Sequence, residues 1–228
     1  MRTVISRGSV RGGLLSAAVV GSLLLGATGC GGGGDKDKLP KDYKVVAGTQ
    51  LCGGDAVSAD ASKALKVITG SSRFEASGEE YTVAQTAADL VEAFPVPTVP
   101  KDACRVHTPI GTPDFELRIT GNLEDGASTG ASAPNFTVLK MGERSVAAAD
   151  KAYVFFACRS ARLLDSSRVA HIDIGVERGG MPKDPQDNVK ALKDAYATVA
   201  HSFSLAVAKE LRCEKNGGLP ERPVLDPA

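Results

Sequence analysis

Apart from Cys30, which belongs to the N-terminal segment, the chain has four cysteines, and they constrain its fold more than any other feature of its sequence. They stand at Cys52, Cys104, Cys158 and Cys213 and are separated by 52, 54 and 55 residues. An even set of cysteines in an exported chain is typical of disulfides, whereas a metal site needs closer ligand spacing. No two of the four form a C-x-x-C motif, and only Cys104 has a nearby histidine, His107, which on its own is too few ligands for a metal site. We therefore predict two disulfides, with a metal site or free thiols as the alternatives.

A short repeat favours one of the three pairings that four cysteines allow. The tripeptide Ala-Cys-Arg surrounds both Cys104 and Cys158, and an alternating segment follows each, at 115–119 and at 170–174. The pattern indicates one strand–turn–strand unit used twice, and hence two related halves, unless the short repeat is a coincidence. If each unit is linked to its own helical segment, the pairs are Cys52–Cys104 and Cys158–Cys213.

The first 29 residues have the pattern of an export signal. Arg2, Arg7 and Arg11 form a basic leader without an acidic residue, an apolar run spans 14–25, and small residues precede Cys30. These are the three parts of a secretory signal peptide. An uncleaved membrane anchor is the alternative, but the apolar run is shorter than the roughly 20 residues that a transmembrane helix needs.

The residues Ala27-Thr28-Gly29-Cys30 resemble the lipobox of bacterial lipoproteins. In that family the thiol of the cysteine receives a diacylglyceryl group and the signal is cleaved just before it, which predicts lipidation of Cys30 and a membrane anchor. Ala27 departs from the family pattern, which has a bulky aliphatic residue there, so ordinary cleavage after Gly29 remains the alternative. The glycine-rich and charged segment 30–41 is predicted to be a flexible tether.

Composition argues against several classes of function. Without residues 1–29 the chain has 24 Lys and Arg against 27 Asp and Glu, so there is no basic surplus for binding nucleic acid. The chain has no Trp for a carbohydrate platform of exposed indoles. The sequence points to no cofactor and no metal.

The hydrophobic pattern predicts an α+β domain over 42–216. Helices are expected at 58–69 with Ser58 as N-cap, at 82–94, and from Asp184 and Pro185 to 211, the last about 40 Å long. Strands are expected at 43–46, 115–119, 136–141, 152–159 and 169–177, with a loop at 121–134 and a disordered tail at 217–228. Because strands and helices do not alternate strictly, we expect an antiparallel sheet packed against two or three helices, including the long C-terminal one.

Few residues suggest chemistry. The string 126–130 matches the G-x-S-x-G nucleophile motif, but it lies in the expected loop without a following helix, so a flexible loop is the preferred interpretation. His107, His171 and His201 are too scattered to predict a metal site or a base. Arg105 and Arg159 follow equivalent cysteines and are the candidate pair for binding a carboxylate or phosphate, with structural salt bridges as the alternative.

The whole arrangement resembles the small lipoproteins of the actinobacterial cell envelope. The likeness rests on the lipobox, the glycine tether, Leu51-Cys52 and the helical end 208–213, and it implies an outer-face location but no activity. We expect a non-catalytic binding or interaction module with an envelope protein as partner. The alternatives are a hydrolase acting on envelope material and, less suited to a domain of this length, a two-lobed solute receptor.

Overall fold

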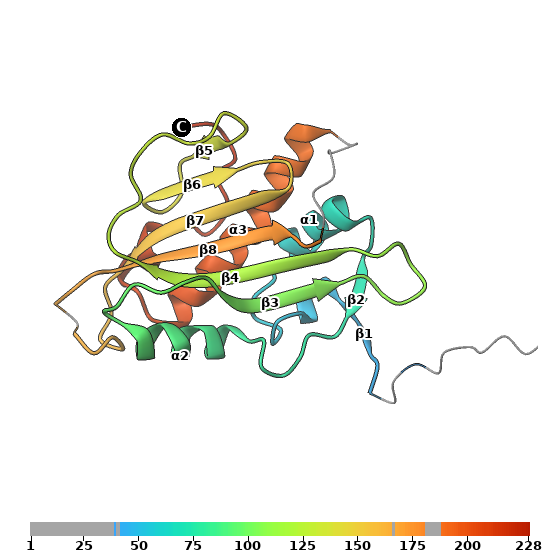
Figure 1. Cartoon of the computed structure of the whole chain (residues 1–228), viewed down its shortest axis with the longest axis horizontal. Helices are drawn as coiled ribbons and strands as arrows, with labels where there is room; N and C mark the ends of the chain where they lie inside the picture. Colours follow the sequence, from blue (N-terminus) through green and yellow to red (C-terminus); the bar gives the residue numbers. More distant parts are fainter. Residues whose placement is uncertain (1–38, 40–41, 166, 181–187) are drawn as a thin grey trace, which may run out of the picture. The chain divides into compact units, whose positions relative to one another are not determined.

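The domain is built around an antiparallel sheet (Figure 1). The computed structural model describes residues 39, 42–165, 167–180 and 188–228, so the predicted signal peptide, Cys30 and most of the tether lie outside the described residues. The main sheet has six strands in the order β3-β4-β8-β7-β6-β5, and a smaller one pairs β1 with β2. With three α-helices in the described part of the chain, this confirms the predicted α+β class.

The elements follow one another along the chain with these bounds: β1 Val45–Ala47, α1 Ala59–Thr69, β2 Arg73–Glu75, α2 Val83–Ala93, β3 Lys101–His107, β4 Glu116–Glu124, β5 Thr137–Leu139, β6 Arg144–Ala147, β7 Lys151–Cys158, β8 Ala170–Arg178 and α3 Val189–Glu210. Two short 3₁₀ helices, at Gly48–Gln50 and Glu214–Gly218, precede α1 and follow α3. Within the described residues, no helix combines the length and the apolar character needed to cross a membrane.

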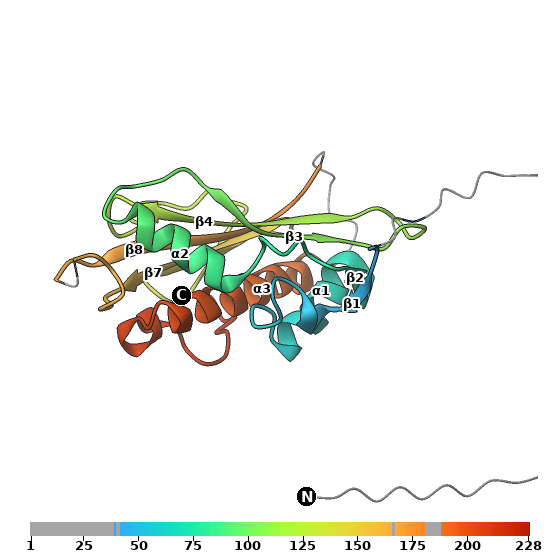
Figure 2. The same ribbon diagram turned by 90° about the horizontal axis from the view of Figure 1, so that it is seen from below.

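The helices lie against one face of the main sheet (Figure 2). Helix α3 packs on β6, β7 and β8, α1 packs beside α3, and α2 lies near β3 and β4 at the sheet's edge. Strand β7 alternates strictly between buried and half-buried residues, with Val154 and Phe156 turned toward α3. This alternation is typical of a strand with one covered face. The opposite face, which we call the open face, carries no helix among the described residues.

The predicted N-cap of α1 is confirmed, and α2, expected over 82–94, proves to be capped by its first expected residue. The Ser58 hydroxyl accepts a hydrogen bond from the Ala61 amide at 3.1 Å, and Thr82 caps α2 in the same way. Helix α1 ends at Gly70, whose φ of 74° is the left-handed conformation that glycine tolerates. The prolines that follow Phe94 prevent α2 from continuing.

The predicted start of α3 needs correction. The described helix begins at Val189, and its N-cap is Asn188, whose side chain accepts a hydrogen bond from the Ala191 amide. Asp184 and Pro185, the expected start, lie outside the described residues. The 22 residues of α3 give a length of about 33 Å, shorter than predicted.

Two further predictions were wrong. Strand β4 runs on to Glu124, through residues assigned to a loop, because Leu123 is buried and continues the apolar alternation past Gly121. The tail after 217 is not disordered: Leu219 is buried, Pro227 forms a β-bridge with Leu139, and the Ala228 amide donates to the Val138 carbonyl at 2.9 Å. Its apolar side chains have a core to pack against, which the content of Pro and Gly concealed.

Both predicted disulfides are present. Cys52 is bonded to Cys104 of β3, and Cys158 at the end of β7 is bonded to Cys213, just after α3. Strands β3–β4 and β7–β8 are both antiparallel hairpins, as the repeat predicted. Their registers differ, because Cys104 lies opposite Ile119 within its hairpin, whereas Cys158 lies opposite Ala170 at the last pair before the turn. The two units therefore share a pattern of elements but not their detailed pairing.

Candidate functional site

The structure does not bring the two predicted arginines together. Arg105 on β3 forms ion pairs with Asp102 at 2.6 Å and Glu116 at 3.0 Å. Arg105 lies in the same cross-strand row of the sheet as Lys151, the first residue of β7. Arg159 lies eight residues beyond Lys151, which is about 26 Å along an extended strand. The Arg159 guanidinium donates instead to the Ser167 carbonyl at 2.9 Å. The repeat suggested that Arg105 and Arg159 form one anion site. The two strands between β3 and β7 and the different registers of the two hairpins keep these arginines apart.

The ion pairs of Arg105 belong to a small network on the open face. Asp102 accepts hydrogen bonds from both Arg105 and Arg118. Burial acts to raise the pKa of Asp102, but the hydrogen bonds from Arg118 and Arg105 outweigh it and hold the pKa below its ordinary value. Arg105 therefore forms structural salt bridges, which was the alternative to anion binding. The network links β3 to β4 by pairing acidic with basic side chains.

The other chemical candidates do not converge. The 126–130 string lies in the connection between β4 and β5, and no helix follows it. The Nδ1 of His171 lies 2.8 Å from a Glu143 carboxylate oxygen, whereas the Nε2 of the buried His201 lies 2.8 Å from the Pro220 carbonyl oxygen in the helical layer. Among the residues that the structure describes, no group of three His, Cys, Asp or Glu could hold a metal ion.

A buried polar pair in the middle of the open face escaped the sequence analysis. Asn122 of β4 lies directly opposite Asp173 of β8, and the two residues are only 3% and 8% exposed. Each has one side-chain oxygen without a hydrogen-bond partner among the described residues. Burial raises the pKa of Asp173 to about 7, and the carboxylates of Glu124 and Glu177 add to the effect. The alternation over 170–174 is visible in the sequence, but the burial of Asp173 is not.

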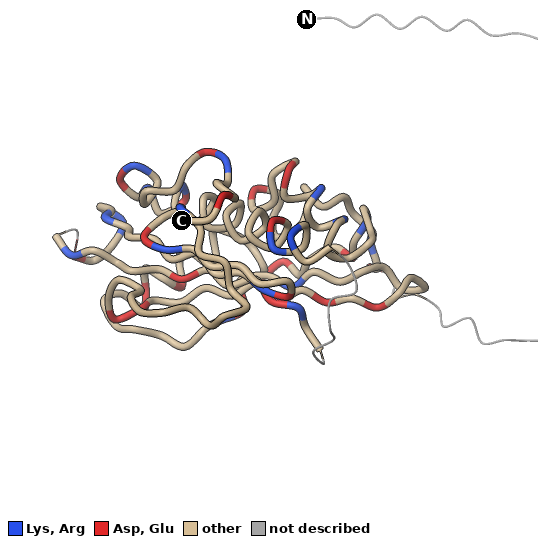
Figure 3. Tube along the Cα trace, turned by 90° about the horizontal axis from the view of Figure 1, so that it is seen from above, with Lys and Arg blue, Asp and Glu red and all other residues tan. Residues whose placement is uncertain are grey.

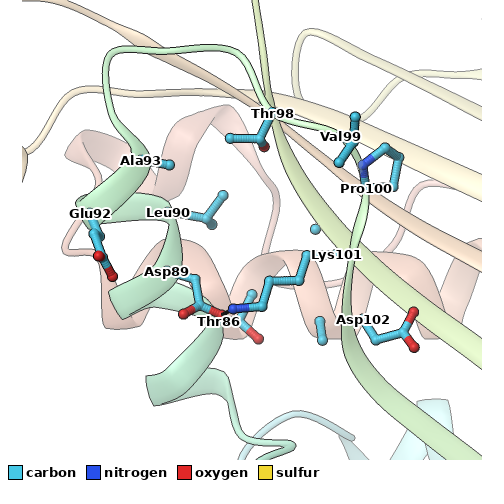
Figure 4. A pocket seen from close by; sticks show the side chains of 12 residues that line it. Thr86, Asp89, Leu90, Glu92, Ala93, Thr98, Val99, Pro100, Lys101 and Asp102 are labelled. Atoms are coloured by element: carbon cyan, nitrogen blue, oxygen red, sulfur yellow. Dashed lines mark ion pairs between the residues drawn. The ribbon is translucent and has the colours of Figure 1, made fainter.

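A hollow between α2 and β3, which we call the edge groove, is lined by both polar and apolar residues (Figure 4). Its volume is about 570 Å³, within the range of small-molecule and peptide-contact sites. Buried Leu90, Ala103 and Gly121 contribute to its lining. Figure 4 shows the Lys101 side chain extending toward Asp89, with which it forms an ion pair at 2.6 Å.

The walls of the edge groove are held in place by specific contacts. The Thr98 amide donates to the Leu123 carbonyl at 2.9 Å, and the Thr98 hydroxyl accepts from the Leu123 amide at 3.0 Å. A Cβ at Gly121 would lie 3.3 Å from side-chain carbons of both Thr86 and Ile174, so the glycine permits α2 to approach β4 closely. These contacts fix the positions of α2, β4 and the connection to β3 around the groove.

The connection between α2 and β3, which lines part of the edge groove through Thr98, Val99 and Pro100, exposes two apolar side chains. Val96 and Val99, in the connection between α2 and β3, are 63% and 81% exposed. Exposed apolar side chains gathered beside a recess are typical of surfaces that contact other proteins. Elsewhere in the described part of the domain, basic and acidic positions are interspersed along the chain (Figure 3).

Comparison of the chain with protein-family models, with curated proteins and with solved structures finds no match, so its function has to be inferred from its own residues.

Proposed function

We propose that this protein is a lipoprotein anchored through Cys30 to the outer face of the cell membrane, and that its domain binds an envelope protein without catalysing a reaction. The signal-like segment, the lipobox-like residues before Cys30 and the four cysteines in two disulfides all support an extracytoplasmic location. The tether would hold the domain close to the membrane surface.

The edge groove is the observation that carries the binding role. Val99 in its lining and the nearby Val96 in the same connection are exposed to solvent, buried Leu90 and Ala103 lie inside, and the Asp89–Lys101 ion pair supplies a polar contact. A partner that covers the two valines would gain their burial, about 1.5–3 kcal/mol for each side chain that becomes fully buried. The ion pair would select among apolar partners, because a mismatched charge at the opening is costly.

The anchor is tested by the substitution Cys30→Ala in the native host. The variant should be released to the medium or remain unprocessed, whereas the wild-type protein should fractionate with the membrane. A variant that stays membrane-bound and normally cleaved would show that lipid is not the anchor.

The partner is tested by placing a photo-cross-linking amino acid at Val99 in cells that express the anchored protein. Leu164, which is 79% exposed against 81% for Val99, gives a matched control outside the groove. A protein adduct that forms from position 99 and not from position 164 would support docking at the edge groove. Equal labelling at the two positions, or none at position 99, would contradict it.

A further inference from the structure

A second hollow lies at the other side of the sheet, where α3 begins. It is enclosed by the first turns of α3, strands β5 and β6, and the C-terminal segment, and we call it the apolar cavity. Its volume is about 470 Å³, comparable to known small-molecule sites. Its lining consists of Leu139, Ala147, Val189, Leu225 and Pro227, together with Thr137, Lys190, Lys193 and Asp194.

The C-terminal segment makes the cavity a defined recess rather than an open sheet edge. The bridge between Leu139 and Pro227 and the hydrogen bond from the Ala228 amide hold the segment beside β5. Leu225 packs against the core, and Ala147 is 1% exposed. An unbranched alkyl chain suits such a space, because each buried methylene contributes about 0.8 kcal/mol without requiring a hydrogen bond.

The two lysines that line the cavity differ in how far their charges are compensated by carboxylates. Lys190 pairs with Asp194 at 2.6 Å, and Asp226 also acts on it to raise its pKa, so Lys190 is already compensated. The half-buried Lys193 donates to the Thr137 hydroxyl at 3.0 Å and has no carboxylate within ion-pair distance among the described residues. An ammonium with only a neutral acceptor beside apolar surface is suited to bind an anion.

The position of the cavity strengthens the preference for an anion. Val189, Lys190, Lys193 and Asp194 come from the first six residues of a 22-residue helix. The aligned peptide dipoles place about half a positive charge at this end of the helix. Lys193 and the helix end therefore act in the same direction.

We propose that the apolar cavity binds a single-chain anionic amphiphile, with the alkyl chain between α3 and β5 and the anionic head at Lys193. The site is separate from the edge groove, so the cavity can bind an amphiphile whether or not the groove binds a protein. A ligand of this class is available beside a membrane, either as a free fatty acid or as a single-chain phospholipid.

The proposal is tested by calorimetric titration of the full mature chain carrying Cys30→Ala, which removes covalent lipid that could compete. The probes are decanoate, decanol and decylamine, each below its micelle concentration. Decanoate should bind most tightly and decylamine most weakly. Lys193→Met should weaken decanoate binding roughly fivefold and leave decanol binding unchanged, because it removes a single partly exposed charge contact. Lys63→Met, at an exposed ion-paired lysine of α1, should change neither.

Two further variants test the location. Ala147→Leu places three extra carbons inside the cavity, and Val189→Trp, at a 47% exposed rim position, obstructs its entrance without changing the core. Each should weaken both decanoate and decanol at least tenfold. Competition of decanoate by single-chain phosphatidylglycerol would identify membrane lipid as the source of the ligand, and its absence would identify a free fatty acid.

The proposal is overturned if decanoate shows no saturable binding, or if decylamine binds as tightly as decanoate. It also fails if Lys193→Met and Lys63→Met behave alike, or if Val189→Trp folds and still binds with unchanged affinity. Because the cross-linking experiment concerns another surface, its failure and this one are independent.

Discussion

The substitution Asp173→Asn should stabilise the domain at neutral and alkaline pH. Asp173 is 8% exposed, lies opposite Asn122, and has an oxygen without a partner among the described residues. Its charged form is disfavoured by burial and by the nearby carboxylates of Glu124 and Glu177. Asparagine has nearly the same shape, carries no charge, and can donate to the Asn122 oxygen at any pH.

The magnitude follows from the linkage between protonation and folding. The pKa of Asp173 is about 7 in the folded domain against an ordinary value of 3.8, so the folded state holds a proton that the unfolded chain releases over this range. Below about pH 4 the carboxyl is protonated in both states, so Asp173 does not lower the free energy of unfolding. As the pH rises toward about 7, the unfolded chain alone releases the proton and the free energy of unfolding falls. At about 1.4 kcal/mol per pKa unit, the loss above pH 7 approaches about 4 kcal/mol.

Urea unfolding of wild type and Asp173→Asn at pH 4.5, 6 and 8 measures this difference directly. The free energies of unfolding should be similar at the lowest pH, and the variant should become more stable by up to about 4 kcal/mol at the highest. Asp60→Asn, at an exposed ion-paired position of α1, serves as the control and should show no comparable trend. A difference that does not change with pH, or a variant less stable than wild type at pH 8, would refute the argument.

Three further predictions concern the covalent and steric supports of the fold. Replacing Cys158 and Cys213 with Ala should lower the free energy of unfolding by about 4 kcal/mol, because their disulfide closes a 55-residue separation in the unfolded chain; urea denaturation of the double variant measures this. Gly121→Val should cost about 1–3 kcal/mol, since a Cβ there already lies 3.3 Å from two side chains, whereas Gly126→Ala, with nothing within 4 Å, should be nearly neutral in thermal melts. Gly217→Ala should cost about 1–3 kcal/mol, because its φ is +67° and a Cβ would lie 2.6 Å from an aromatic carbon of β7; an unchanged melting temperature would contradict this.

Local signals account for what the sequence predicted well. Ser58 and Thr82 start helices because their side chains satisfy amides that a helix leaves unbonded, and this requires knowledge of only four consecutive residues. The two disulfides were accessible for a different reason. The Ala-Cys-Arg repeat suggested that Cys104 and Cys158 are equivalent, and the further assumption that each repeat is linked to its own helical segment favoured the pairs that the structure shows.

The features that the sequence could not reveal depend on contacts between distant segments. The C-terminal segment is ordered because β5 and the core lie beside it, although its own composition resembles a linker. Asp173 alternates with Ile172 and Ile174 as a residue of an uncovered face would, so local alternation cannot show that it is only 8% exposed. The edge groove requires α2 to approach β4 closely at Gly121, and no sequence motif marks that approach.

The C-terminal segment also bears on how many copies of this domain can coexist at a surface. An edge strand exposes unpaired amide and carbonyl groups that can join the sheet of a neighbouring molecule. Strand β5, at one edge of the main sheet, is only three residues long, and Pro227, which has no amide hydrogen, forms a bridge to it. At the other edge, α2 lies near β3. The proposed lipid anchor would concentrate the protein in two dimensions, and the short β5 with Pro227 beside it would oppose, at that edge, the sheet-to-sheet association that such crowding favours.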